Sequence, residues 1–226
     1  MSHCAPTPAP ALTGGKIALV GNPNVGKSIL FHRLTGQYAV VANYPGTTVE
    51  ITQGLAKALP QVVVLDTPGI VSFPARSEDE RVTAQVLLRD ELQAVLQVGD
   101  AKNLRRTLLL AAQIAEMGVP QVLALNMVDE ARARGLSVRP ELIQSALNIP
   151  VIPTVATRGQ GMDSLIQSVQ HAAAPSFHLP YPQPVEDSLD RIQPLLPAAR
   201  IAPRALALLW LSEDGVADEW LRENLS

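Results

Sequence analysis

An apolar run at residues 16–20 leads directly into Gly21-Asn22-Pro23-Asn24-Val25-Gly26-Lys27-Ser28, and residues 27–34 then show helical spacing. Strand, glycine-rich turn and helix in this order form the context in which the pattern G-x-x-x-x-G-K-[ST] binds phosphate. The glycines let the backbone wrap closely around a phosphate, and the amides at the helix N-terminus supply partial positive charge. The stretch therefore predicts a nucleotide-binding loop with contacts from Gly21 to Ile29. In it, Lys27 bridges the β- and γ-phosphates and Ser28 binds Mg²⁺.

Beyond this loop, short apolar runs alternate with segments of helical spacing. The strand candidates are residues 16–20, 49–59, 62–65, 94–98, 121–125 and 150–155, and the helical candidates are residues 27–34, 104–117, 139–147 and 162–173. Such alternation is typical of a mostly parallel sheet covered by helices on both faces. We therefore expect a three-layer α/β domain with a six-stranded sheet, in which residues 49–59 pair antiparallel with residues 62–65.

The composition changes near residue 175, where Pro175, Pro180, Pro182 and Pro184 follow one another closely. We expect a flexible N-terminus at residues 1–15, a nucleotide-binding domain at 16–174, a linker at 175–185 and a small all-helical domain at 186–226. Helical character in the last part lies at residues 187–196, 204–211 and 216–225. About forty residues cannot bury a substantial core alone, so these helices are expected to pack on the first domain or on one another.

Charge and cysteine content narrow the class of protein. The net charge is −3 and the pI about 5.8, which argues against nucleic acid as the main partner. The cluster of Arg132, Arg134 and Arg139 is interpreted as a solvated helix end. Cys4 is the single cysteine, so an intrachain disulfide is excluded and a reducing cytoplasm fits. No apolar stretch has the length of a bilayer span and no secretory signal is recognisable, so the chain is expected to be soluble.

Two further segments are expected to complete the phosphate site. Asp66-Thr67-Pro68-Gly69 follows the strand candidate at 62–65. There Asp66 is placed to hold the Mg²⁺ shell through water, and the Gly69 amide to meet a γ-phosphate. Tyr44-Pro45-Gly46-Thr47-Thr48 precedes the strand candidate at 49–59. We expect Thr48, rather than Thr47, to close over the metal, because motifs of this kind place the ligand two residues after the glycine.

The base is expected to be read by two loops nearer the C-terminus. Asn126-Met127-Val128-Asp129 stands where a guanine-reading N-K-x-D follows its strand. The Asp129 carboxylate is suited to the N1–H and exocyclic amine of guanine, a donor pair that adenine lacks. Asn126 is expected to brace the loops, and Met127 to flank the base with its long side chain although it lacks the ammonium of lysine. Val155-Ala156-Thr157 follows, with an amide near Ala156 directed at the guanine carbonyl oxygen.

Taken together, these stretches resemble one family. GNPNVGKS, LTG, YPGTTVE, DTPG, SEDERV, VGDAKNLRRTLLL, LALNMVDEARARG and VATRGQG are similar to the GTPase domain of the bacterial ferrous iron transport protein B. The resemblance covers about residues 16–173, and RALALLWLSEDGV resembles the family's small helical domain. The methionine in NMVD distinguishes this family from ribosome-assembly GTPases, which keep N-K-x-D.

This resemblance implies a Ras-like P-loop GTPase fold, bound GTP or GDP, and hydrolysis of GTP with Mg²⁺. It places the chain on the cytoplasmic side of the bacterial inner membrane. Its partner would be a membrane-embedded iron-permeation domain that is absent from this chain, and the chain's end at Ser226 suits a fragment. Self-association into a homo-oligomer is compatible with the resemblance, whereas nucleic acid is not an expected partner.

Hydrolysis is expected to proceed without a catalytic glutamine, because Ile70 follows Gly69. The resemblance suggests that Asn24 helps to bind a K⁺ ion between the α- and γ-phosphates, with backbone carbonyls of residues 42–44 completing its shell. The expected catalytic set is therefore Lys27, Asn24, Thr48 and Gly69. Charge stabilisation and alignment supply much of the rate of phosphoryl transfer, so slow, K⁺-stimulated turnover is expected. Nucleotide binding is expected in the micromolar range, with fast release.

Two other functions stay open at the level of sequence. A standalone ribosome-assembly GTPase would use the tail to bind RNA, but the tail has neither a GxxG loop nor a basic run. A nucleotide-binding module without turnover is disfavoured by the complete set Lys27, Ser28, Thr48 and Asp66.

Overall fold

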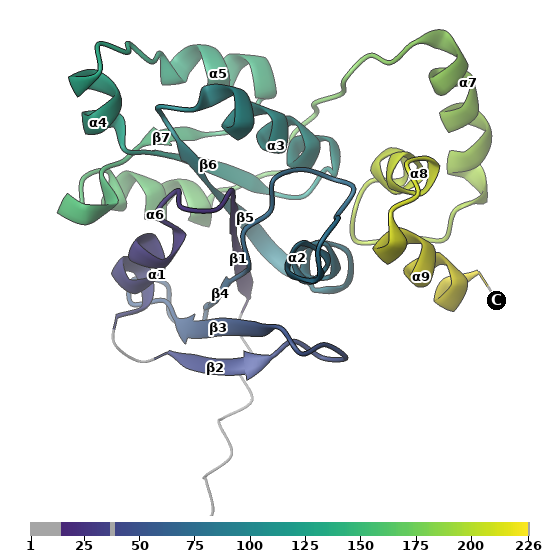
Figure 1. Cartoon of the computed structure of the whole chain (residues 1–226), viewed down its shortest axis with the longest axis horizontal. Helices are drawn as coiled ribbons and strands as arrows, with labels where there is room; N and C mark the ends of the chain where they lie inside the picture. The colour runs from purple at the N-terminus through teal and green to yellow at the C-terminus, as the bar shows by residue number, and fades with distance from the viewer. Residues whose placement is uncertain (1–14, 37–38, 226) are drawn as a thin grey trace, which may run out of the picture.

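The computed structural model describes residues 15–36 and 39–225. In this part of the chain a seven-stranded sheet has the order β2-β3-β4-β1-β5-β6-β7 (Figure 1). Its strands are β1 (Lys16–Gly21), β2 (Val40–Asn43), β3 (Glu50–Leu55), β4 (Val63–Asp66), β5 (Leu92–Asp100), β6 (Gln121–Asn126) and β7 (Val151–Pro153). Except for Gly15, the expected flexible segment 1–15 lies outside the described residues.

The prediction of a mostly parallel sheet is confirmed, but the number of strands is corrected from six to seven. β3 is antiparallel to both of its neighbours, with Thr52 opposite Asp66 in β4, and the other pairs are parallel. The additional strand is β2, which lies at the edge of the sheet with all four residues exposed. Because neither face of β2 is buried, its sequence has no apolar alternation that would reveal it.

Helices cover both faces of the sheet, as expected for a three-layer domain. They are α1 (Lys27–Thr35), α2 (Glu78–Arg89), α3 (Leu104–Glu116), α4 (Val128–Ala133), α5 (Pro140–Leu147) and α6 (Met162–Gln170). α1 and α6 share one buried cluster with one face of the sheet, while α2, α3 and α5 pack against the opposite face. α2 and α4 are not among the helices that the apolar spacing predicts. α2 nevertheless begins with a recognisable cap, in which Ser77 Oγ accepts a hydrogen bond from the Glu80 N–H.

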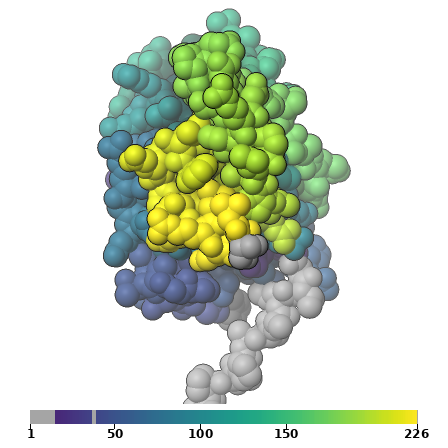
Figure 2. Space-filling view, turned by 90° about the vertical axis from the view of Figure 1, so that its right-hand side faces the viewer, coloured from purple at the N-terminus to yellow at the C-terminus, as the bar shows by residue number. Residues whose placement is uncertain are grey.

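The C-terminal part contains α7 (Gln183–Ile192), η2 (Gln193–Leu195), α8 (Pro203–Leu211) and α9 (Gly215–Asn224). α7 begins before residue 187, inside the stretch that composition marks as a linker, because Pro184 is tolerated in a first helical turn. Leu206 and Trp220 of the tail are buried in the same cluster as Val86 of α2. Figure 2 shows the green and yellow tail lying as one patch on the body of the molecule. The division into domains stays a prediction.

Among the described helices, none combines the length and the apolar character that a membrane crossing requires.

Candidate functional site

Residues 21–28 join β1 to α1 where the parallel strands end. Asn24 and Gly26 have φ values of 63° and 92°, in the left-handed region. Asparagine tolerates this conformation better than most residues, and glycine adopts it freely. A Cβ on Gly26 would lie 2.5 Å from Nδ2 of Asn126, so the position also lacks space for a side chain. The turn brings the chain into α1, whose first amides have no partner within the helix and are available to an anion.

Ser28 and Asp66 meet beside this loop, as the sequence predicts for a magnesium site. Ser28 Oγ donates a hydrogen bond to Asp66 Oδ2 at 3.1 Å. The other oxygen, Asp66 Oδ1, is buried and has no hydrogen-bond partner in the described structure. An orphaned carboxylate oxygen next to a hydroxyl is a donor set that fits Mg²⁺, because this hard cation prefers oxygen ligands.

The charges of Lys27 and Asp66 are partly removed from water. Burial lowers the pKa of Lys27, and the nearby Asp66 carboxylate opposes that shift. Burial also raises the pKa of Asp66, opposed by Lys27, by the Ser28 hydrogen bond and by His32. Phosphate oxygens beside Lys27 and a divalent cation beside Asp66 would each favour the charged form of the side chain.

The DTPG segment lies directly against the phosphate loop. A Cβ on Gly69 would approach Pro23 Cγ to 3.0 Å, so the two backbones are in close contact. The Ile70 N–H donates to the Gly21 carbonyl oxygen at 3.0 Å, and Asn22 Nδ2 donates to the Ile70 carbonyl oxygen at 2.9 Å. The Asn22 side chain thus holds the neighbouring loop rather than facing a ligand. Ile70 itself is fully buried in the core, where a glutamine side chain would find no water.

Thr48 is not brought to Ser28 and Asp66. The turn between β2 and β3 closes with a hydrogen bond from the Tyr44 N–H to the Val49 carbonyl oxygen at 3.0 Å. Thr48 lies on its tip, exposed, and lines an open groove with residues of α2 and α9, namely Glu78, Arg81, Gln85 and Glu219. Its role as a metal ligand therefore stays a prediction, and it requires this hairpin to move.

Asn126 holds three loops together. Its Nδ2 donates to the Val25 carbonyl oxygen at 2.9 Å. Its Oδ1 accepts hydrogen bonds from the Ala156 N–H at 3.0 Å and from Thr154 Oγ1 at 3.3 Å. The brace expected from the sequence is present, because both ends of one amide connect the phosphate loop to the loop at 155–157.

Asp129 lies in the first turn of α4, with an exposed edge. Oδ1 accepts a hydrogen bond from the Glu130 N–H at 2.9 Å, and Arg158 Nη2 lies 3.8 Å from Oδ2. Arg158 is two-thirds exposed, so it is free to move aside when the carboxylate receives a base. The Ala156 amide, which was expected to contact guanine, is occupied by Asn126.

Lys102 is a residue of this region that sequence reasoning missed. It comes from the loop between β5 and α3, and its Nζ lies 3.1 Å from Met127 Sδ and 2.6 Å from Glu130 Oε2. Lys102 follows the end of β5, and loops at the carboxyl ends of parallel strands often build binding sites. Its position along the chain was therefore the only signal of a role in the site, and a weak one.

Arg33 of α1 is a second such residue. Nε donates to the Ala156 carbonyl oxygen at 3.1 Å and Nη2 to the Thr157 carbonyl oxygen at 2.6 Å. The helix that begins at the phosphate loop is thereby tied to the loop at 155–157. Partners separated by more than a hundred residues leave no local pattern, so nothing in the sequence indicated this contact.

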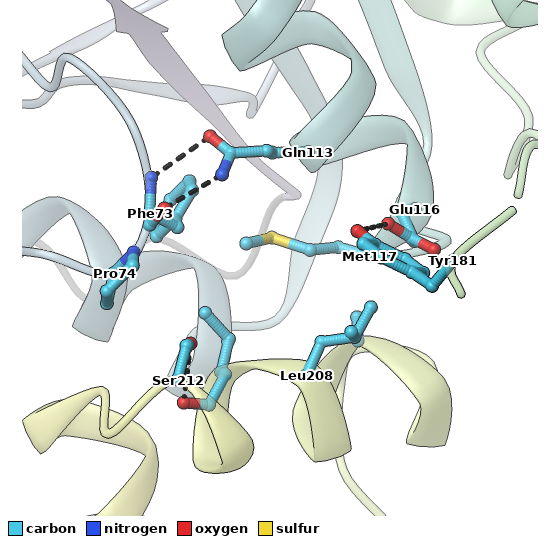
Figure 3. A pocket seen from close by; sticks show the side chains of 10 residues that line it. Phe73, Pro74, Gln113, Glu116, Met117, Tyr181, Leu208 and Ser212 are labelled. Atoms are coloured by element: carbon cyan, nitrogen blue, oxygen red, sulfur yellow. Dashed lines mark hydrogen bonds between the residues drawn. The ribbon is translucent and has the colours of Figure 1, made fainter. Parts of the chain in front are cut away.

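The loop after DTPG leads to a separate cavity of about 200 Å³ between α3 and α8 (Figure 3). The Gln113 side chain holds Phe73 at the wall, accepting from its N–H at 3.0 Å and donating to its carbonyl oxygen at 2.8 Å. On the other side, Leu208 and Ser212 come from the tail. Within the described residues, no group of three or more His, Cys, Asp or Glu side chains is placed to hold a metal ion.

Comparison with known proteins agrees with this geometry. Residues 15–169 match the family model described as ferrous iron transport protein B. The Fe(2+) transporter FeoB of Escherichia coli is 35% identical over 189 residues, which cover 80% of this chain and 24% of that protein. FeoB of Staphylococcus aureus is 34% identical over 175 residues, covering 76% and 26%. The chain thus spans about a quarter of the length of these curated relatives.

Two groups of solved structures share the fold. A GDP-bound NFeoB mutant of S. thermophilus is 33% identical, with a TM-score of 0.83 over 92% of this chain and 83% of that one. The cytosolic domain of the T. maritima FeoB iron transporter in its GMPPNP form is 32% identical, with a TM-score of 0.84 over 92% and 85%.

Proposed function

The chain belongs to the ferrous iron transport protein B family, and on that basis we propose that it binds and hydrolyses GTP to regulate or drive Fe²⁺ uptake across a membrane. The observation that carries this proposal is the convergence of Lys27, Ser28 and Asp66 beside a loop that Asn126 connects to the base-reading segments. The residues proposed for phosphate chemistry and for base recognition are thereby joined through one side chain.

The phosphate half of the mechanism follows from the residues in place. The α1 amides and the Lys27 ammonium bind the phosphate oxygens and stabilise the charge that develops during transfer. Ser28 and Asp66 would hold Mg²⁺, joined by Thr48 when the β2–β3 hairpin closes. Bound Mg²⁺ would neutralise charge on the β- and γ-phosphates. The Gly69 amide meets the γ-phosphate, and its contact with Pro23 transmits loss of that phosphate to the loop at 70–76.

The base half depends on Asp129. We infer that its carboxylate pairs with the guanine N1–H and amine while Met127 flanks the ring, and that residues 155–157 close the site. For the Ala156 amide to reach the guanine carbonyl oxygen, its hydrogen bond to Asn126 Oδ1 must be shared or exchanged.

We further propose that turnover is slow and stimulated by K⁺. Ile70 is buried and cannot orient water, so alignment must come from the backbone and from charge. Asn24 lies in the turn of the phosphate loop, where its left-handed φ of 63° suits an asparagine, and its role in binding a monovalent cation is the one that the family resemblance implies. In a longer protein the tail would pass the nucleotide state to a membrane-embedded permeation domain from the cytoplasmic side, alone or as a homo-oligomer.

The deciding experiment measures binding of GTP, GDP and ATP by calorimetry, and GTP turnover in KCl and in NaCl. We expect micromolar binding of GTP and GDP, no comparable binding of ATP, and faster turnover in KCl. Asn24→Ala should remove the difference between the salts while GDP binding persists. Binding of ATP as tight as that of GTP would refute guanine recognition, and identical rates in both salts would refute the role of K⁺.

A further inference from the structure

We propose that Lys102 supplies, from the loop after β5, the positive charge that Met127 lacks, and that its ammonium binds the nucleoside of a guanine nucleotide at the rim of the base site. This inference rests on the proposed function, since it assigns a further binding residue to the same site.

The sheet places Lys102 beside the base-reading loop. Asp100 at the end of β5 pairs with Asn126 at the end of β6, and the Ala101 N–H donates to the Asn126 carbonyl oxygen at 2.9 Å. The next residue, Lys102, is fixed by a hydrogen bond from its own N–H to Asp100 Oδ1 at 2.8 Å. Its side chain then reaches Met127, with 3.1 Å between Nζ and Sδ.

Met127 and Lys102 together supply the long stem and the ammonium that a lysine in N-K-x-D would carry alone. Met127 Cε lies 3.8 Å from where a Cβ on Gly26 would stand, so the methyl end of the side chain reaches the phosphate loop. The sulfur lies between that methyl group and the Lys102 ammonium. An apolar stem that flanks the base and a cation beside it, normally one side chain, are here divided between two.

The charges around Lys102 show why a nucleotide would recruit it. Asp100 and Glu130 lie beside the ammonium, and Asp129 precedes Glu130 in α4. Lys102 Nζ lies 2.6 Å from Glu130 Oε2 and 3.8 Å from Asp100 Oδ1. Its side chain is 14% exposed, whereas that of Glu130 is 52% exposed. Because the Glu130 side chain is more than half exposed, its carboxylate can turn into solvent and leave the ammonium to a nucleoside oxygen.

The competing explanation is that Lys102 only braces the protein by pairing with Glu130. The two explanations predict opposite effects of Glu130→Gln. If the ion pair were the function, Glu130→Gln and Lys102→Met would weaken nucleotide binding equally. If Lys102 binds the nucleotide, Glu130→Gln releases the ammonium and leaves GDP affinity unchanged or higher.

The test measures GDP affinity by calorimetry for wild type, Lys102→Met, Glu130→Gln and the swap Lys102→Met with Met127→Lys. Lys57→Met is the matched control, since it removes the same charge from an exposed position on the β3–β4 turn. Thermal melting without nucleotide checks that each variant folds. We expect Lys102→Met to weaken GDP binding roughly tenfold, a size typical of one charged hydrogen bond. The control should stay within about twofold, and the swap should recover most of the loss.

Two results would overturn the inference. One is a GDP affinity of Lys102→Met equal to that of Lys57→Met. The other is a loss of GDP affinity in Glu130→Gln as large as the loss in Lys102→Met. If Lys102→Met proves unfolded, the swap variant decides, provided that it folds. A GDP affinity of the swap variant as low as roughly a tenth of the wild-type value would refute the inference. Failure of the wild type itself to bind GDP would instead refute the proposed function, so the two failures are distinguishable.

Discussion

Asp214 accepts a hydrogen bond from the backbone N–H of Ala75, with 2.9 Å between Oδ2 and the nitrogen. Ala75 belongs to the loop that follows DTPG, and Asp214 is the N-cap of α9, where Oδ1 accepts from the Val216 and Ala217 amides at 3.0 Å. The carboxylate is buried. One side chain therefore begins the last helix and holds the loop that follows Gly69.

The first prediction concerns this carboxylate. Asp214→Ala should lower the free energy of unfolding by about 2–3 kcal/mol, because it removes an N-cap and leaves the Ala75 N–H unpaired. Asp214→Asn keeps one acceptor oxygen and should cost less. Urea unfolding at neutral pH measures both. Asp218→Ala on the same helix is the control, since its pair with Arg222 is exposed. If neither Asp214→Ala nor Asp214→Asn changed the free energy of unfolding, Asp214 would not hold the loop.

Contacts between residues of recognisable motifs could be predicted from the sequence, whereas contacts between other distant segments could not. Ser28 meets Asp66, and Asn126 meets the phosphate loop, because motif spacing and strand ends fix where such side chains lie at one edge of a parallel sheet. The contacts of Arg33 and Lys102 depend on side chains from distant segments, which no local pattern records. β2 is the short, mostly apolar run Val40–Asn43 without alternation, and its place at the exposed edge depends on its pairing with β3. By contrast, Ser77 and Glu80 do carry a capping signal, and α2 was predictable from it.

Thr48 illustrates a different limit. Its motif indicates a metal ligand, yet the structure places it on the α2 and α9 side of the hairpin. The motif describes the position in which Thr48 would reach the metal, and that position requires the β2–β3 hairpin to close.

A second prediction concerns Asp66. Asp66→Asn should abolish the tightening of GDP binding by Mg²⁺, because one carboxylate oxygen of the metal site is lost. Calorimetry with Mg²⁺ and with EDTA measures this change. GDP binding that responds to Mg²⁺ as in wild type would show that the orphaned Oδ1 is not part of a metal site.

The same pair of proteins also tests the pKa of Asp66. Burial raises this pKa above its ordinary value of 3.8, so the folded, nucleotide-free protein binds the proton more tightly than the unfolded chain. The resulting stabilisation is complete below the ordinary value and is lost as the pH rises through the raised one. The unfolding free energy of wild type relative to Asp66→Asn should therefore increase on acidification. A difference that is independent of pH would contradict the raised pKa.

A third prediction concerns Arg33. Arg33→Ala removes two hydrogen bonds from α1 to the carbonyl oxygens of Ala156 and Thr157, so the loop at 155–157 should open more often. We expect GDP dissociation to accelerate roughly fivefold to twentyfold, measured by stopped-flow with a fluorescent GDP analogue. Arg33→Lys keeps one donor group, so its rate of GDP dissociation should lie between those of wild type and Arg33→Ala. Arg191→Ala on α7 removes the same charge from an exposed place and should not change the rate. Release as slow as in wild type would contradict the clamp.

The last prediction concerns the acid stability of the tail. Arg204 Nη1 donates to Glu186 Oε2 at 2.7 Å, and its Nε donates to Glu116 Oε1 at 3.1 Å. The hydrogen bond from Arg204, helped by the Tyr181 N–H, lowers the pKa of Glu186 to about 2 from 4.5. A carboxylate with a lowered pKa stabilises the fold above its ordinary value, and that contribution is lost as the pH falls from 4.5 towards 2.

Wild type should therefore lose stability in this pH window more steeply than Glu186→Gln, whose side chain does not titrate. Urea unfolding followed by tryptophan fluorescence at several pH values measures the two slopes, because Trp210 and Trp220 both lie in the tail. Glu141→Gln removes an exposed carboxylate from α5 and should follow wild type. Parallel curves for wild type and Glu186→Gln would mean that Arg204 does not hold the Glu186 carboxylate in solution.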